Sequence, residues 1–213
     1  MSADKRIAVL SLGGTIAMLR ADDGGVVPSL SGQALVDAVP ELGEVATIEA
    51  ESFRQVPGVQ LSLDDLCALA VHVRERIEAG VDGVVVTQGT DTLEETSFLL
   101  DLLHGSDAPV VFTGAMRARQ SPGADGPGNL LAAVQTAAAD GARGLGSLLV
   151  MHDEIHAARF VQKTHVSLPA AFRSYPGPVG WVAEGGPGSR PDRRAPRCTR
   201  SRWRRAAARA SPC

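Results

Sequence analysis

Two short segments of the sequence bring threonine hydroxyls together with glycine. Gly13 and Gly14 precede Thr15 directly behind the apolar run 7–10, and the segment 87–92 (TQGTDT) holds three threonines, a glycine and an aspartate. Glycine lets a backbone or a ligand approach closely, and a hydroxyl beside it can act as a nucleophile if a base takes its proton. Taken alone, each segment also fits a tight turn or a helix cap.

The base that such a hydroxyl needs has few candidates, because the sequence has only two lysines, Lys5 and Lys163. Lys5 precedes the first apolar run and is typical of a solvated strand end. Lys163 follows the fifth predicted strand. A lysine folded into a water-poor crevice loses its proton more readily and can then act on a hydroxyl. Lys163 is therefore open to two interpretations: an exposed loop lysine, which its position alone favours, or a proton acceptor.

Apolar runs and helical patterns alternate along the chain and predict the scaffold for these groups. Runs of Val, Ile and Leu are typical of a parallel sheet covered on both faces. The first helical pattern has an N-cap at Ser62 and ends at Gly80. The fold class is therefore α/β, with a doubly wound, mostly parallel sheet. The predicted strands are 5–12, 45–53, 83–86, 109–112 and 147–151, and the predicted helices are 63–77, 92–103 and 128–139.

Four segments that follow predicted strands carry the polar and glycine residues of interest: 13–15, 53–61, 87–92 and 113–117. In a doubly wound sheet the ligand crevice lies outside the carboxyl ends of the strands. We therefore expect the four segments to converge on one pocket.

Composition favours a globular domain without a membrane span. The chain has 213 residues, 44% of them apolar, which suffices for a sizeable core. No segment approaches the roughly 20 apolar residues that a spanning helix needs. The glycines at 13–14 interrupt the first apolar run too early for a secretory signal, so we predict a cytoplasmic protein. We predict no disulfide framework from Cys67, Cys198 and Cys213.

Three potential metal ligands, His152, Asp153 and His156, follow the fifth predicted strand. A metal site needs a further convergent ligand, and the sequence offers none nearby. We interpret these residues as a polar loop and predict neither a metal nor a cofactor.

The motifs resemble those of the L-asparaginase family. Gly13–Ala17 (GGTIA) and Gly89–Thr96 (GTDTLEET) are similar to the two signature motifs of these homotetrameric amidohydrolases, which convert asparagine to aspartate and ammonia. The resemblance extends over residues 5–183 in the family's order and spacing. Further matches are TGAMR at 113–117, ADGPGNL at 124–130, and the segment from Val150 to Thr164.

The resemblance implies roles for individual residues. Thr15 matches the nucleophilic threonine, and Thr90, Asp91 and Lys163 match a proton-handling triad. In this scheme Lys163 draws the proton of Thr90, and Asp91 stabilises the lysine cation and holds the substrate's α-amino group. Ala115 matches a position whose backbone meets the leaving amide. The substrate-binding residues that the resemblance implies are Gly58, Val59, Gly89, Thr90, Asp91 and Ala115.

Two positions depart from the family pattern. Gly58 stands where family members usually have a serine that holds the substrate's α-carboxylate. The segment 18–28 lacks the tyrosine that much of the family places near the nucleophile, and the only tyrosine of the chain is Tyr175. We expect weaker or altered substrate recognition, and an activation of Thr15 that either relies on another group or is slow.

Charge divides the chain into two parts, because residues 187–213 contain nine of the 21 basic residues and one of the 24 acidic residues. Family members are longer, and a second α/β domain from a neighbouring subunit completes their site. We predict an asparaginase-like N-terminal domain at 1–185, with the second, smaller domain missing, and a basic, disordered tail at 186–213. A shifted reading frame explains this tail better than a deliberately basic segment.

Two functions follow from these expectations. The favoured one is hydrolysis of L-asparagine or L-glutamine, impaired in this short chain and without the family's tetramer. The alternative is a catalytically inactive, truncated product whose arginine-rich tail binds nucleic acid or acidic surfaces nonspecifically. No membrane partner is expected.

Overall fold

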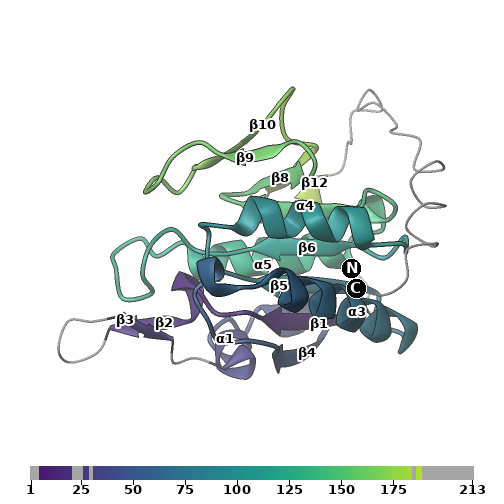
Figure 1. Cartoon of the computed structure of the whole chain (residues 1–213), viewed down its shortest axis with the longest axis horizontal. Helices are drawn as coiled ribbons and strands as arrows, with labels where there is room; N and C mark the ends of the chain where they lie inside the picture. The colour runs from purple at the N-terminus through teal and green to yellow at the C-terminus, as the bar shows by residue number, and fades with distance from the viewer. Residues whose placement is uncertain (1–4, 21–25, 29–30, 184–185, 189–213) are drawn as a thin grey trace.

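The computed structural model describes residues 5–20, 26–28, 31–183 and 186–188. Its centre is an eight-stranded sheet with the order β12-β11-β8-β7-β6-β5-β1-β4 (Figure 1). The strands from β4 to β7 pair in parallel, and the β7/β8, β8/β11 and β11/β12 pairs are antiparallel. The bounds are β1 Arg6–Ser11, β4 Thr47–Ser52, β5 Gly83–Thr87, β6 Val110–Thr113, β7 Ser147–Met151, β8 Glu154–Ala157, β11 Gly180–Ala183 and β12 Gly186–Gly188.

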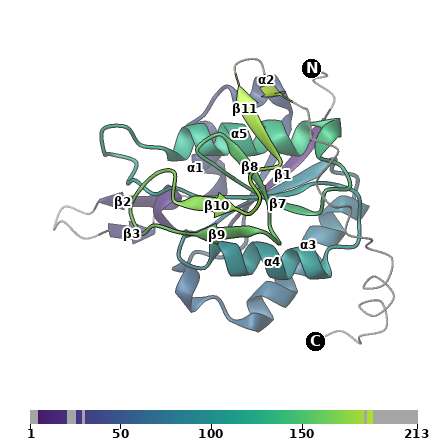
Figure 2. The ribbon, with the colours of Figure 1, turned by 90° about the horizontal axis from the view of Figure 1, so that it is seen from above.

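Helices cover both faces of this sheet, as a doubly wound fold requires. Helices α1 and α5 lie on one face and α3 and α4 on the other (Figure 2). Two small antiparallel sheets, β2/β3 and β9/β10, stand apart from the main sheet. The bounds are α1 Gly32–Asp37, α2 Leu42–Val45, α3 Leu63–Glu78, α4 Leu93–Leu103, α5 Gly126–Ala138, η1 Thr15–Ala17, η2 Gly58–Gln60, η3 Asp140–Ala142, β2 Met18–Arg20, β3 Val26–Pro28, β9 Val161–Lys163 and β10 Phe172–Ser174. The predicted fold class is confirmed.

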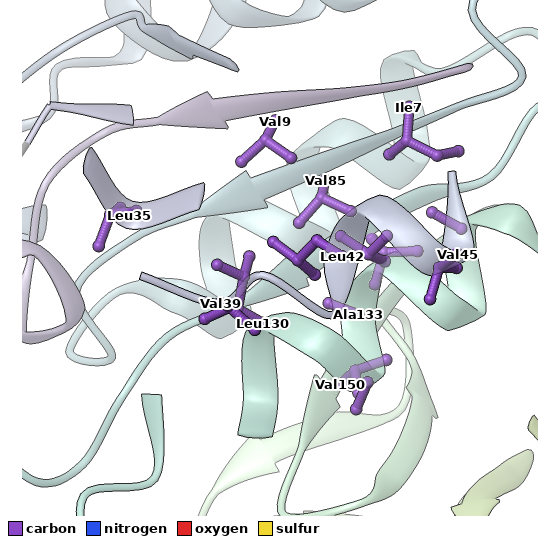
Figure 3. Close-up of a cluster of buried hydrophobic side chains, with 14 of the residues drawn as sticks. Ile7, Val9, Leu35, Val39, Leu42, Val45, Val85, Leu130, Ala133 and Val150 are labelled. Atoms are coloured by element: carbon purple, nitrogen blue, oxygen red, sulfur yellow. The ribbon is translucent and has the colours of Figure 1, made fainter. Parts of the chain in front are cut away.

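Alternating strand residues build one apolar core on each face. Val9 and Val85 point toward α5, where Leu130 and Ala133 pack against them (Figure 3). Leu10 and its even-numbered neighbours point the other way, toward α3 and α4. Because both faces are covered, the central strands are apolar throughout, which is why they are readable from the sequence.

The longest helix begins and ends where the sequence indicates. The Ser62 hydroxyl accepts a hydrogen bond from the Asp65 N–H at 3.1 Å, and the Asp65 carboxylate accepts one from the Ser62 N–H at 3.1 Å. The Ser62 hydroxyl also donates to the Asp65 carboxylate at 2.7 Å, and this bond, followed by the Ser62 N–H and the Arg54 side chain, lowers the pKa of Asp65 to about 2. Gly80 has φ +95°, a left-handed conformation that ends a helix and favours glycine. The second predicted strand, 45–53, starts later than expected, at Thr47, because residues up to Val45 belong to α2.

Of the predicted polar loop, His152 and Asp153 do form a turn, but His156 lies in a strand. His152 and Asp153 have φ values of 51° and 62°, and they form the two-residue turn of a hairpin in which Met151 pairs with Glu154. Two residues in the left-handed region match the right-handed twist of an antiparallel hairpin. Asn-Gly is the usual sequence for such a turn, so His-Asp gave little signal. Residues 154–157 are therefore strand β8.

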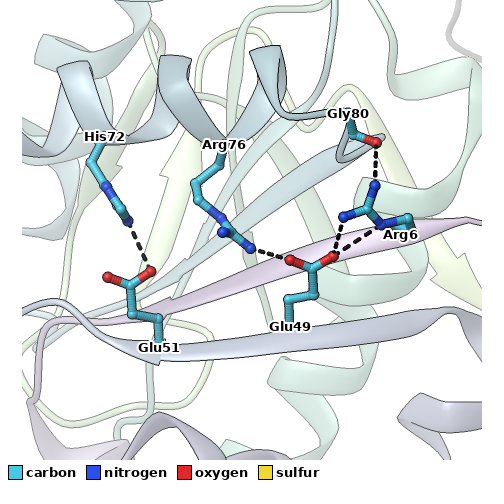
Figure 4. A network of polar contacts seen from close by, with 6 residues as sticks. All are labelled: Arg6, Glu49, Glu51, His72, Arg76 and Gly80. Atoms are coloured by element: carbon cyan, nitrogen blue, oxygen red, sulfur yellow. Dashed lines mark hydrogen bonds and ion pairs between the residues drawn. The ribbon is translucent and has the colours of Figure 1, made fainter.

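A network of charges fixes the edge strand β4 to its neighbours. Glu49 accepts hydrogen bonds from Arg6 of β1 at 2.6 and 3.0 Å, and it also contacts Arg76 of α3 (Figure 4). Beside it, Glu51 contacts His72 at 2.9 Å. Hydrogen bonding from Arg6 lowers the pKa of Glu49. The network joins β4, β1 and α3 at the edge of the sheet farthest from β12.

The remaining predictions on chain organisation concern parts outside this description. Of the predicted basic tail, only residues 186–188 are described, and they form β12. Residues 189–213 lie outside the described residues, so tail and nucleic-acid binding stay predictions. Within the described ranges, no helix combines the length and the apolar character needed to cross a membrane.

Candidate active site

The first glycine segment lies directly against the second. Gly13 and Gly14 have φ values of 103° and 87°, so both adopt a conformation that side chains disfavour. A Cβ atom on Gly14 would lie 2.2 Å from the backbone nitrogen of Gly89. Only glycine allows the two backbones to approach this closely. Thr15, half-buried at the start of η1, is thereby held beside the segment that carries Thr90.

The other two strand-end segments meet at the same place. A Cβ atom on Gly58 would lie 2.8 Å from the hydroxyl oxygen of Thr92. A Cβ atom on Gly114 would lie 2.6 Å from the carbonyl oxygen of Gln88 and 3.2 Å from a methyl carbon of Thr90. The four segments that follow the parallel strands therefore converge, as predicted, with the segment 87–92 at their centre.

Lys163 reaches this centre from the small β9/β10 sheet. Its ammonium Nζ donates hydrogen bonds to Thr90 Oγ1 and to Asp91 Oδ1, each at 2.9 Å. The lysine side chain is 14% exposed and that of Asp91 is 75% exposed, so the ion pair faces solvent on its carboxylate side. Lys163 lies in a strand with its side chain mostly covered, and the alternative of an exposed loop lysine is wrong.

Not all predicted site residues are joined by hydrogen bonds. Among the hydrogen bonds of the described residues, none links the Thr15 hydroxyl to the Lys163 group. Buried Ala115 lies near the segment that carries Thr15, because a Cβ atom on Gly126 would contact both Ile16 and Ala115, at 3.1 and 3.4 Å. Val59, predicted to bind substrate, is largely exposed.

Two residues that sequence reasoning gave no role hold the segment around Ala115. The Asp125 carboxylate accepts hydrogen bonds from the backbone N–H groups of Met116 at 3.0 Å and Arg117 at 2.9 Å. Asn129 donates to the Gly114 carbonyl at 3.0 Å. Both residues belong to the motif ADGPGNL, which the sequence showed as a family match but to which it gave no role. Their hydrogen bonds fix the backbone that is proposed to meet the leaving amide.

A shallow apolar pocket adjoins this segment. Its lining comes from η1, from α1 and the residues after it, from the segment after β6, and from the start of α5. The lining residues are Ile16, Leu35, Ala38, Val39, Ala115, Arg117, Arg119, Gly126, Pro127 and Leu130.

The Thr92 hydroxyl occupies the space beside Gly58. Gln88, fully buried, donates a hydrogen bond from Nε2 to Thr92 Oγ1 at 3.0 Å. That oxygen is where a side chain at position 58 would have to go. The surroundings of Gly58 therefore leave no room for a side chain at this position.

We predict that Gly58→Ser destabilises the protein by about 1–3 kcal/mol, the usual cost of inserting atoms into a packed site. In the double variant with Thr92→Ala most of this cost disappears, because the obstructing hydroxyl is gone. Thr92→Ala alone also destabilises the protein, because it removes the acceptor of the buried Gln88 Nε2, so the double variant is compared with Thr92→Ala. Urea unfolding of the parent, the two single variants and the double variant gives the coupling free energy between positions 58 and 92. Strictly additive changes would contradict the contact.

His156 of β8 is buried beside β10 and is neutral at pH 7. Its side chain is 1% exposed, and its Nδ1 is 2.8 Å from the Ser174 hydroxyl of β10. Burial, and next the charge of Arg173, lower its pKa to about 4. The contact of Nε2 with Glu154 at 3.4 Å is therefore not an ion pair at neutral pH. Within the described ranges, no group of three His, Cys, Asp or Glu side chains is arranged to hold a metal ion.

We predict that stability falls as the pH drops from about 6.5 to about 4. In this window the unfolded chain binds a proton at His156 that the folded chain excludes, so unfolding gains up to about 3 kcal/mol. Above pH 6.5 both states have a neutral imidazole, and the full stability is present. His156→Gln removes this proton uptake and flattens the curve, whereas His165→Gln, at an exposed position, does not. Urea unfolding at several pH values measures the free energy of unfolding of each protein. If this free energy falls equally steeply with pH in the parent and in His156→Gln, the prediction is wrong.

Comparison with known proteins identifies the family. Residues 6–190 match the family model described as "Asparaginase, N-terminal". This match spans most of the chain and includes every predicted site residue. The chain belongs to the asparaginase family.

Named relatives agree with this asparaginase assignment. The chain is 40% identical to "Probable L-asparaginase" of Deinococcus radiodurans, over 83% of this chain and 53% of the relative. It is 39% identical to "L-asparaginase 2" of Bacillus subtilis, over 84% of this chain and 49% of the relative. "Glutaminase-asparaginase" of Pseudomonas fluorescens biotype A is 37% identical, over 84% and 51%. The chain thus spans about half the length of these relatives.

A solved structure of the same family has the same fold. It is titled "Probable Cytoplasmic L-asparaginase" and comes from Campylobacter jejuni. The TM-score is 0.79 at 36% identity, covering 86% of this chain and 56% of the other. The matched part is again about half of the relative.

Proposed function

We propose that this asparaginase-family chain hydrolyses the side-chain amide of L-asparagine to L-aspartate and ammonia, with Thr15 as the nucleophile. The proposal rests on two hydrogen bonds of Lys163. Its Nζ donates to Thr90 Oγ1 and to Asp91 Oδ1, each at 2.9 Å. This group lies where the Gly14–Gly89 contact brings the Thr15 segment. A hydroxyl nucleophile and a proton acceptor on touching segments are what acyl transfer requires.

The reaction begins with attack of Thr15 Oγ on the amide carbon. The Thr15 proton passes to Thr90 Oγ1, whose own proton has gone to the neutral Lys163 amine, and the electron pair of the C=O bond moves to oxygen, which backbone N–H donors stabilise. When this pair returns, the C–N bond breaks and the nitrogen leaves as ammonia after gaining a proton. The Lys163 ammonium supplies the proton that the leaving nitrogen gains. Water then cleaves the ester on Thr15 and releases aspartate.

Lys163 and Thr90 transfer protons during this cycle. A neutral Lys163 amine takes the proton of Thr90, and the carboxylate of Asp91 stabilises the resulting ammonium. The exposed side of Asp91 remains open for the substrate's α-ammonium group. Ala115, held by the hydrogen-bonded segment around it, offers backbone groups to the leaving amide.

The α-carboxylate of the substrate has a weaker partner than in family members with a serine. Gly58 offers only its backbone, since no side-chain hydroxyl is present there. We therefore expect a raised KM for asparagine. Because some relatives are named glutaminase-asparaginases, L-glutamine is the second substrate to assay.

Ammonia release tests the function, and it is measured on two proteins. One is the 213-residue chain, and the other is residues 1–183 fused to the remaining half of the Deinococcus relative. The chain aligns with about half of that relative, 53% of its length. If the relative's other half completes the site, the fusion turns over faster, on the order of 10²-fold, because it orients the substrate and excludes water. Size-exclusion chromatography reports whether the fusion also assembles. No ammonia from either protein would refute the function, and equal rates would refute the need for the second half.

A further inference from the structure

Lys163 is not fixed by the main sheet. It ends β9, which pairs with β10 in a separate two-stranded sheet. Thr90 and Asp91, by contrast, follow β5 of the main sheet and precede α4. Figures 1 and 2 both draw β9 beside α4, and the two elements are in contact. A contact between β9 and α4 therefore has to set the distance between the lysine and its partners.

Glu94 makes such a contact through the backbone of Lys163. Lys163 lies opposite Phe172 in the β9/β10 pair, and the next residue, Thr164, donates its N–H to the Ala171 carbonyl at 2.7 Å. Ladder bonds alternate along an antiparallel strand, so the N–H of Lys163 points away from β10. On that side it donates to the carboxylate Oε2 of Glu94.

We propose that Glu94 is a positioning residue that holds the backbone of Lys163 so that its ammonium reaches Thr90 and Asp91. The three acceptors come from one short stretch at the start of α4, so the lysine is held at two points, its N–H and its Nζ. This inference goes beyond the proposed function, on which only its kinetic consequence rests.

The surroundings of Glu94 suit this role. Glu94 lies in the first turn of α4, where the helix dipole favours a carboxylate. Its backbone carbonyl accepts a hydrogen bond from the Ser97 hydroxyl at 2.9 Å, which steadies the same turn. Glu95, the next residue, is exposed and has the same charge. Glu95 is therefore a matched control.

The two lysines of the chain allow a test that does not depend on activity. An amine-reactive N-hydroxysuccinimide ester labels Lys5 and Lys163, and mass spectrometry gives the ratio of the two. Their side chains are 27% and 14% exposed. Glu94→Asp keeps the charge but shortens the reach, and we expect Lys163 to be labelled several-fold faster relative to Lys5. Glu94→Gln keeps the length and an acceptor oxygen, and we expect the parent ratio. Glu95→Asp should also give the parent ratio.

The kinetic consequence is a loss of turnover. A displaced Lys163 lowers kcat for asparagine by about 10²-fold in Glu94→Asp with little change in KM, as a small misplacement of a reacting group does. Glu94→Gln restores the rate.

An unchanged labelling ratio in Glu94→Asp would overturn the proposal, and so would an equal rise in Glu95→Asp or in Glu94→Gln. Circular dichroism of each variant shows that the ratio is read on folded protein. Failure of the proposed function has a different signature: ammonia release absent, or insensitive to Thr15, with the labelling pattern intact.

Discussion

Thr15→Ala abolishes ammonia release from asparagine and leaves the fold unchanged. The variant lacks the hydroxyl that we propose as the nucleophile, which directly follows the positive-φ pair Gly13 and Gly14. The hydroxyl lies on a half-buried turn, so its loss costs at most about 1–2 kcal/mol of folding stability. Initial rates, circular dichroism and melting curves are measured on the same samples.

Thr15→Ser is the matched variant, because it keeps a hydroxyl on the same turn. We expect it to retain measurable turnover, since serine supplies the same nucleophilic atom. Turnover by Thr15→Ala at the parent rate would exclude Thr15 as the nucleophile. A collapse of the fold in Thr15→Ala would instead show that the turn has a structural role.

Lys163→Met lowers turnover by roughly 10²–10⁴-fold, the usual loss when an acid or base partner is removed. Methionine keeps most of the volume of the mostly covered lysine stem, but it cannot exchange a proton with Thr90. The carboxylate of Asp91 is mostly exposed, so it stays solvated when its partner is removed. Steady-state rates over a pH series separate the proton-transfer defect from a loss of substrate affinity.

Lys5→Met is the control for this prediction. Lys5 is the only other lysine, and it pairs with Asp82 at 3.4 Å and Asp140 at 3.1 Å. These contacts lie at the amino ends of the strands, opposite the proposed site, so Lys5→Met should keep the parent rate. Equal rates in Lys163→Met and the parent would reduce Lys163 to a structural residue.

The sequence predicts the parts of the fold that local chemistry determines. The buried strand Ser147–Met151 agrees to the residue, because an apolar run flanked by turns has few alternative interpretations. The helix Leu63–Glu78 was readable from its capping box. Strand β8 was missed because the two left-handed residues of its turn, His152 and Asp153, are not the usual turn residues.

The site was less accessible to reasoning from residues alone. Spacing indicated that four segments converge, but the pairing of Lys163 with Thr90 joins residues 73 apart and came from the family resemblance. The support from Glu94 and the buried state of His156 depend on how β9 and β10 pack against α4 and β8. Such long-range packing leaves no periodic signal in the chain.

The central claim is that Thr15 forms a covalent bond with the substrate, and peptide mapping of protein quenched by acid during turnover tests it most directly. The account predicts that the peptide containing Thr15 gains the mass of one aspartyl group, attached as an ester, while ammonia accumulates. The adduct should be absent from Thr15→Ala. Ammonia release with no adduct on this peptide, or with the adduct on another residue, would contradict the account.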